Sequence, residues 1–117
     1  MDRMTLKVSK DFSRTPGPRY VKEGDFSGEL FRNTKLFPAI LEAVEKQMLL
    51  VIDLDGTIGY GTSFLEESFG GLIRENKLEY STILKHLSLI SEEEKYLEQD
   101  VYEYLKDAYE EKQSSRR

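Results

Sequence analysis

The stretch Met48-Leu49-Leu50-Val51-Ile52-Asp53 decides the fold. Five apolar residues in succession, ending at an acid, are typical of a strand covered on both faces, as in the centre of a parallel sheet. The segment from Asp55 to Gly61 that follows is rich in glycine and is predicted to be a loop. We therefore predict a central strand whose carboxyl end opens into that loop.

A helix is predicted before this strand, with Ser27 as its capping residue. The apolar residues between Leu30 and Val44 fall along one helical face. Pro38 interrupts the pattern, and a proline disfavours the α conformation of the residue before it. We therefore expect either two short helices or one kinked helix.

A second helix is predicted after the loop. Its apolar residues fall at i, i+4, i+7 and i+8, the spacing of a helix that packs on a sheet; they are Leu65, Phe69, Leu72 and Ile73. Two consecutive glycines, Gly70 and Gly71, weaken a helix, so their presence predicts the close approach of a neighbouring group.

Further strands are predicted at Thr5–Val8 and Leu87–Ile90, with a helical turn at Ser81–His86 between them in the chain. Ser91 and Glu94 match a capping box that would open a closing helix. The apolar face of that helix consists of Leu97, Val101, Tyr104, Leu105 and Ala108.

Strands that alternate with helices around one buried run predict an α/β fold, layered, with a small, mainly parallel sheet and helices packed on it. A length of 117 residues suits one hydrophobic core. We predict a single domain over residues 1–110, followed by a flexible C-terminal tail over residues 111–117.

The composition excludes several classes of function. The chain has no cysteine, which removes disulfides, thiolate catalysis and thiolate zinc sites, and its one histidine, His86, cannot form a metal cluster alone. We therefore predict no metal and no cofactor. A net charge of −5 opposes binding to nucleic acid, and no apolar run is long enough to span a membrane. The expected location is the cytoplasm.

One motif suggests catalysis. Asp53-Leu54-Asp55-Gly56-Thr57 directly after a buried strand resembles the opening motif of the haloacid dehalogenase-like phosphatases. In that family the first aspartate attacks phosphorus, the second handles the leaving-group proton, and magnesium is bound by a further acidic pair. No Asp-Asp pair follows Asp55 in this chain. A magnesium-dependent phosphatase is therefore kept as the alternative, and we expect a protein that is not an enzyme.

A longer match favours another family. Gly17-Pro18-Arg19-Tyr20, Ser27-Gly28-Glu29 with Phe31-Arg32, Asp53-Leu54-Asp55-Gly56 and the run from Gly59 to Leu72 are similar to the STAS-like domain family of unknown function of bacteria and archaea. The resemblance covers roughly residues 5 to 108. It implies the STAS fold of the bacterial anti-sigma factor antagonists and a regulatory role in protein-protein interaction.

The resemblance also implies a site. In the antagonists a serine at the start of the helix after the loop is phosphorylated by a partner with a histidine-kinase-like ATPase domain, and Ser63 aligns with that serine. Ser63 and Thr62 are thus candidates for a phosphorylation switch. The candidate interaction loop comprises Asp53, Asp55, Gly59, Tyr60, Gly61, Phe64, Glu66 and Glu67.

Two further interpretations remain open from the residues alone. Ser63 and Glu66 match a capping box, which would explain the serine without any regulation. Arg19, Glu29 and Arg32 either form ion pairs that anchor the first helix beside the loop, or offer the two guanidinium groups to a phosphate or a carboxylate.

Overall fold

A computed structural model of the chain describes residues 1–115. Within these residues the strands β1 (Arg3–Lys7), β2 (Leu49–Asp53) and β3 (Leu87–Ile90) form one three-stranded sheet. The order is β1-β2-β3, and both pairings are parallel. The apolar run predicted to form the central strand is therefore the middle strand of the sheet.

Helical segments occupy the connections between the strands and the C-terminal part of the chain. They are α1 (Val8–Asp11), η1 (Val21–Glu23), α2 (Gly28–Phe31), η2 (Arg32–Leu36), α3 (Phe37–Glu45), α4 (Thr62–Leu65), η3 (Glu66–Gly70), α5 (Gly71–Arg74), α6 (Tyr80–His86) and α7 (Tyr96–Ser114). Parallel strands require such long crossovers, because the chain must return from the carboxyl end of one strand to the amino end of the next.

The helix predicted from Ser27 is one continuous run, α2-η2-α3. Ser27 caps it as expected, since its hydroxyl accepts the Leu30 amide at 3.0 Å. Pro38 does not divide the run. Instead the segment before it, η2, is a π-helix, and Phe37 keeps helical angles of φ −62° and ψ −48°. One widened turn relieves the conflict between the proline ring and the preceding turn.

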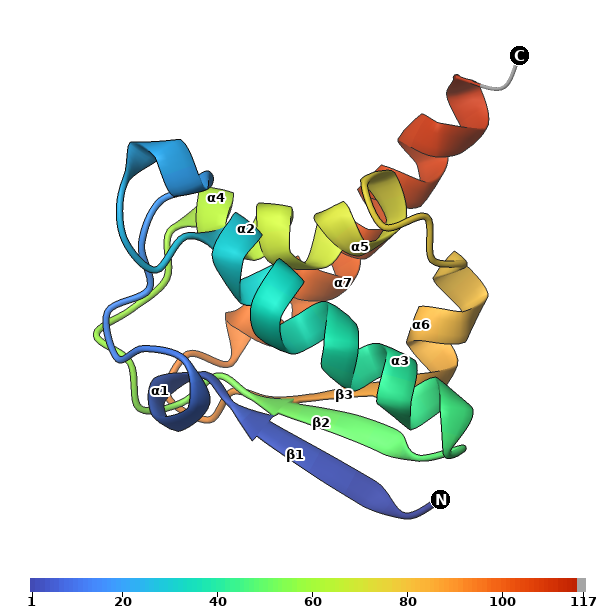
Figure 1. Cartoon of the computed structure of the whole chain (residues 1–117), viewed down its shortest axis with the longest axis horizontal. Coiled ribbons are helices and arrows are strands. Elements are labelled where there is room, and N and C mark those ends of the chain that lie inside the picture. The colour runs from blue at the N-terminus through green and yellow to red at the C-terminus, as the bar shows by residue number, and fades with distance from the viewer. Residues whose placement is uncertain (116–117) are drawn as a thin grey trace.

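The helices pack on one side of the sheet, as Figure 1 shows, and its other side carries no helix in the described chain. The expectation that β2 is covered on both faces is therefore wrong. Successive side chains of a strand point to opposite faces, so Leu50 and Ile52 join the core whereas Val51 points away from it. Val51 is nevertheless buried, because β1 and β3 flank it.

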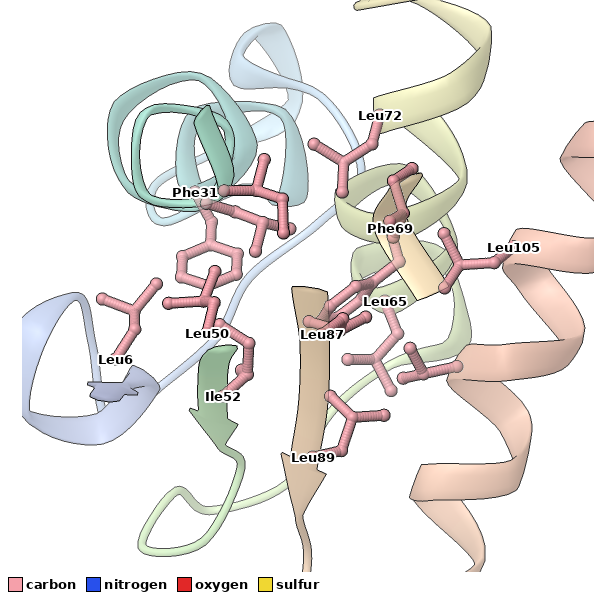
Figure 2. Packing of buried hydrophobic residues seen from close by; sticks show 14 of the residues in the cluster. Leu6, Phe31, Leu50, Ile52, Leu65, Phe69, Leu72, Leu87, Leu89 and Leu105 are labelled. Carbon is pink, nitrogen blue, oxygen red and sulfur yellow. The ribbon is translucent and has the colours of Figure 1, made fainter. Parts of the chain in front are cut away.

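The core lies between the sheet and the helices (Figure 2). The sheet contributes Leu6, Leu50, Ile52, Leu87 and Leu89, and the helices contribute Phe31, Leu65, Phe69, Leu72 and Leu105, among others. The stripe predicted for the second helix is confirmed, since each of its four residues is at most 1% exposed. This packing holds the run α4-η3-α5 across the helix-covered face of the sheet, with α4 toward the carboxyl ends of the strands.

The closing helix differs from its prediction at both ends. α7 begins at Tyr96, and the predicted capping box does not form, because the Ser91 hydroxyl instead donates to the Glu94 carbonyl at 2.6 Å. Residues 111–114, predicted to lie in a flexible tail, continue α7; residues 116 and 117 of that tail lie outside the described part. Within residues 1–115, no helix has the length and apolar composition needed to cross a membrane.

Candidate functional site

The loop after β2 begins at two aspartates whose carboxylates accept hydrogen bonds from backbone amides and from Lys7. Asp53 ends the strand; its Oδ1 accepts the Asp55 amide at 3.0 Å and its Oδ2 pairs with Lys7 Nζ at 3.1 Å. Asp55 accepts the amides of Glu92 and Glu93 at 3.1 and 3.0 Å. The two carboxylates thus join the ends of all three strands.

The tip of the loop is held by further hydrogen bonds although it is exposed. The Tyr60 hydroxyl donates to the Leu54 carbonyl at 2.8 Å, and the Ile58 amide donates to the Arg14 carbonyl at 2.9 Å. Gly59 has φ +135°, which few other residues adopt. Burial raises the pKa of the Tyr60 hydroxyl, so it remains a donor at neutral pH. The Ile58 side chain is 79% exposed on this fixed backbone.

The start of α4 differs from the predicted capping box. Gly61 is the capping residue, no side chain caps the helix, and the Glu66 carboxylate pairs with arginines elsewhere. Thr62 and Ser63 are exposed, whereas Phe64 is buried, with its ring stacked on that of Phe31 at 5.7 Å between centroids. The sequence pattern of a capping box is present, but tertiary ion pairs use its glutamate.

An arginine–glutamate cluster surrounds η3 and α5. Its members are Arg19, Arg32, Arg74, Glu66 and Glu67. Arg19 Nη1 bonds to Glu66 and, at 3.3 Å, to Glu67. Arg74 bonds to Glu66 at 2.9 and 3.2 Å and to Glu67 at 3.2 Å, and Arg32 bonds to both the carboxylate and the carbonyl of Glu67. Arg74 Nε also lies 3.8 Å from a carboxylate oxygen of Glu75, so three guanidinium groups meet three carboxylates and their charges balance.

The centre of this cluster is buried. Arg32 is 4% exposed and Glu67 3% exposed, so each depends on the other for charge compensation. The close approach predicted at the two glycines is confirmed: a Cβ on Gly71 would lie 2.2 Å from Arg32 Nη1, and one on Gly70 would lie 2.4 Å from Glu66 Oε2. Glycine is therefore needed there to make room for charged side chains.

The arginines also determine the ionisation of Glu66. Its burial acts to raise its pKa, but hydrogen bonds from Arg74 and Arg19 outweigh that effect, and the pKa of Glu66 is lowered. The hydrogen bond to Glu66 in turn raises the pKa of Arg19. These ion pairs thus favour the charged forms of Glu66 and Arg19.

Arg19 and Arg32 form ion pairs, as one interpretation of the sequence expected, but Glu29 is not their partner. Glu29 accepts the Val21 amide at 2.9 Å and pairs with neither arginine, because the side chains of Glu66 and Glu67 lie closer to the guanidinium groups. Sequence reasoning missed Arg74. The sequence spacing could have indicated it, because Arg74 follows Glu67 by seven residues and Glu66 by eight, which is two helical turns along the same face.

A family model, described as a STAS-like domain of unknown function (DUF4325), matches residues 27–97. The chain belongs to this family. The match runs from the cap of α2 to the start of α7, so it includes the loop after β2, the first turn of α4 and four members of the cluster. Arg19 precedes the matched region. The chain matches none of the curated proteins and none of the solved structures.

The fold agrees with that of a STAS-like domain, since a small parallel sheet carries packed helices. Among residues 1–115, no three His, Asp or Glu side chains are grouped as ligands for a metal ion. Asp53 and Asp55 are the acids of the phosphatase motif. Their carboxylates are bound by Lys7 and by backbone amides. Neither the comparisons nor this geometry supports the phosphatase alternative.

Proposed function

We propose that this STAS-like domain is a non-catalytic regulatory module that binds a protein partner through the loop from Asp55 to Gly61 and the first turn of α4. The observation that carries the proposal is the exposed pair of hydroxyls at Thr62 and Ser63, where the loop joins the helix. Neither hydroxyl caps the helix, so both are accessible to a modifying enzyme without loss of a structural bond.

The exposed tip of the loop supports a docking role. Ile58 is 79% exposed, yet its backbone is bonded to Arg14 and its neighbour Tyr60 to Leu54. An apolar side chain presented on an ordered backbone loses little conformational entropy when a partner covers it. The exposed acids Glu92 and Glu93 adjoin the start of the loop, since they bond to Asp55 and Gly56. A partner surface with an apolar pocket and a basic rim fits this arrangement.

The kind of partner follows from family analogy. In the anti-sigma factor antagonists, a protein with a histidine-kinase-like ATPase domain binds the corresponding surface and phosphorylates its serine. We infer a partner of the same kind here, with Ser63 or Thr62 as the acceptor. A phosphate adds about −1.5 to −2 charges at neutral pH, which changes the electrostatics of the docking surface.

A binding and labelling experiment tests this proposal. The chain is mixed with histidine-kinase-like ATPases from the same organism and with ATP, complexes are measured by calorimetry, and phosphate is located by mass spectrometry. Ile58→Asp is expected to weaken binding by about tenfold or more, as the loss of a buried anchor does. Leu84→Asp is the matched control, because Leu84 is 40% exposed on α6 and should leave binding unchanged.

The alanine variants assign the acceptor. Ser63→Ala or Thr62→Ala should remove the phosphate at its own position only. Phosphate found elsewhere, or equal binding by the Ile58 and Leu84 variants, contradicts the proposal. Turnover of a phosphate ester with magnesium that disappears in Asp53→Asn would replace the proposal with the phosphatase alternative.

A further inference from the structure

Phe26 presents an aromatic ring at the surface from a backbone conformation that disfavours bulky residues. Its φ is +55°, and the residue is 42% exposed. Such a residue rarely adopts a positive φ, because its Cβ then crowds the following carbonyl oxygen. Gln47 and Lys77 are the other non-glycine residues with a positive φ within residues 1–115, and both are polar. A glycine or an asparagine would suit the turn at Phe26 better.

The backbone at Phe26 is held in place by the residues around it. Its carbonyl accepts the Gly17 amide at 2.8 Å, and Ser27 next to it caps α2. A Cβ on Gly17 would lie 2.1 Å from the Asp25 carbonyl oxygen, so the two arms of this loop are in close contact. The surrounding chain therefore imposes the left-handed conformation on Phe26, and its ring is ordered before any partner binds.

A structural role explains only one side of the ring. A hydrophobic residue before a capping residue commonly packs on the helix that follows. The Phe26 ring meets Phe12 edge to face, with 5.8 Å between the centroids, and Phe12 contacts the buried Phe31 ring at 5.2 Å. One side of Phe26 thus packs on the rim of the core, and the other side remains open to solvent.

Phe26 adjoins the first turn of α4, which belongs to the docking surface proposed above. Gly28 follows Phe26 by two residues, and a Cβ on Gly28 would lie 3.1 Å from Phe64 Cα. Figure 1 shows α2 and α4 next to each other. Phe12, on which Phe26 packs, also contacts the Phe64 ring, with 6.2 Å between the centroids. Two separate contacts therefore make Phe26 continuous with the docking surface.

An open groove lies on the other side of the start of α2. It is lined by Tyr20, Val21, Lys22 and Glu29 and has a volume of about 480 Å³. Tyr20 and Val21 are 40% and 54% exposed. Their backbone is fixed, because the Val21 amide donates to the Glu29 carboxylate at 2.9 Å. Exposed apolar groups that gather in this way mark interaction sites.

We propose that Phe26 and this groove form a second anchor point of the docking surface, which receives apolar side chains of the same partner that covers Ile58. This rests on the proposed function. The occupant is a protein segment with one apolar side chain over the Phe26 ring and another in the groove. Because both features are ordered before binding, little conformational entropy is lost when they are covered.

Charge decides between this partner and a second copy of the chain. Two copies of net charge −5 repel each other. The partner inferred above has a basic rim, which complements the acidic chain. The anchor therefore belongs to the partner of the proposed function.

Phe26→Asn tests the anchor in the full chain. Asparagine tolerates a positive φ, so this change removes the ring and relieves the backbone conflict together. Calorimetry with the histidine-kinase-like ATPases named above measures binding, which should weaken by about tenfold or more. The unfolding equilibrium constant in urea should change by less than about tenfold, because relief of the backbone conflict offsets the lost contact with Phe12.

Two further variants serve as controls. Lys77→Asn is matched to the test variant, because Lys77 also has a positive φ, at +62°, in the connection between α5 and α6. It should bind like the unchanged chain. Phe26→Leu keeps an apolar side chain and should retain most of the binding that Phe26→Asn loses.

The outcomes separate the anchor from the proposed function. If Ile58→Asp weakens binding and Phe26→Asn does not, the anchor is wrong and the proposed function stands. If only Phe26→Asn weakens binding, docking through the loop is wrong and the anchor stands. The absence of any complex with these ATPases removes both.

Two measurements on the chain alone also decide the matter. An unfolding constant that changes by more than about tenfold in Phe26→Asn assigns the ring to the fold and overturns the proposal. Sedimentation should show a monomer. A dimer that Phe26→Asn dissociates would assign the surface to a second copy and would overturn the proposal as well.

Discussion

Two groups of acids lie next to α4, and they are neutralised in different ways. At the strand ends, Asp53 and Asp55 are bound mainly by backbone amides, with Lys7 as one cation. Inside the helix run, Glu66 and Glu67 are bound by arginine side chains. The first group organises backbone, and the second holds separate elements together by charge.

This difference shows which region can respond to a change in charge. Amide donors at the strand ends are fixed in the backbone and are satisfied by the aspartates. Arginine side chains can exchange one anion for another, and Arg19 is partly exposed with unused donors. A change of charge next to the cluster therefore meets mainly arginine side chains, whereas one next to the aspartates meets mainly fixed backbone amides, with Lys7 as the one cation.

The largest effect is expected from the buried ion pair of the cluster. Arg32→Met leaves Glu67, which is 3% exposed, without its buried partner, and such a loss costs about 3 kcal/mol of unfolding free energy. Urea unfolding followed by circular dichroism measures it. The double variant Arg32→Met/Glu67→Gln removes both charges and should recover part of the loss. A single variant that loses less than about 1 kcal/mol would show that the pair behaves like a surface pair.

A smaller loss is expected where a glycine makes room for the cluster. Gly71→Ala places a Cβ 2.2 Å from Arg32 Nη1, and such overpacking costs about 1–3 kcal/mol. Gly61→Ala is the control, because a Cβ there meets no atom within 4 Å. The two variants are compared by their urea midpoints. A Gly71 variant as stable as the Gly61 variant would mean that Arg32 can move aside.

These residues show how far the sequence could predict the structure. Gly70 and Gly71 signalled a close neighbour, and the apolar run at Met48–Ile52 placed the central strand, because both signals are local. The partners of Glu66 were not predictable in this way. Arg19 lies 47 positions away from it, and the choice between a capping bond and an ion pair depends on how the segments meet in space.

Two predicted capping boxes do not form, that of Ser63 with Glu66 and that of Ser91 with Glu94, and tertiary contacts explain both. The Ser91 and Glu94 pattern is a valid capping box, but the chain between β3 and α7 is bonded to Asp55 through the amides of Glu92 and Glu93. That attachment delays α7 until Tyr96. A local propensity is therefore overridden where tertiary bonds fix neighbouring amides, as at Glu92 and Glu93, or divert the glutamate of the pattern, as at Glu66.

A pH dependence is expected from Glu66. Because its folded pKa lies below the ordinary value of 4.5, its charge stabilises the fold above that value, and the contribution is lost as pH falls through the lowered pKa. The free energy of unfolding should therefore fall with acid below about pH 4.5, and less steeply in Glu66→Gln. Urea unfolding between pH 3 and pH 7 measures the slopes. Glu110→Gln, at an exposed position of α7, is the control; slopes that agree for the two variants contradict the assigned role of Glu66.

The smallest effect is expected at Ser63, which matched a capping box in the sequence, and Ser27 is its reference. Ser27 caps α2 through the Leu30 amide, so Ser27→Ala should cost about 1 kcal/mol. Ser63 caps nothing, so Ser63→Ala should change the unfolding free energy by less than about 0.5 kcal/mol. Urea unfolding of both variants makes the comparison. If Ser63→Ala costs as much as Ser27→Ala, then Ser63 has a structural role that is absent from this geometry. A neutral Ser63→Ala variant means that the fold does not depend on the hydroxyl, which a phosphorylation switch at this position requires.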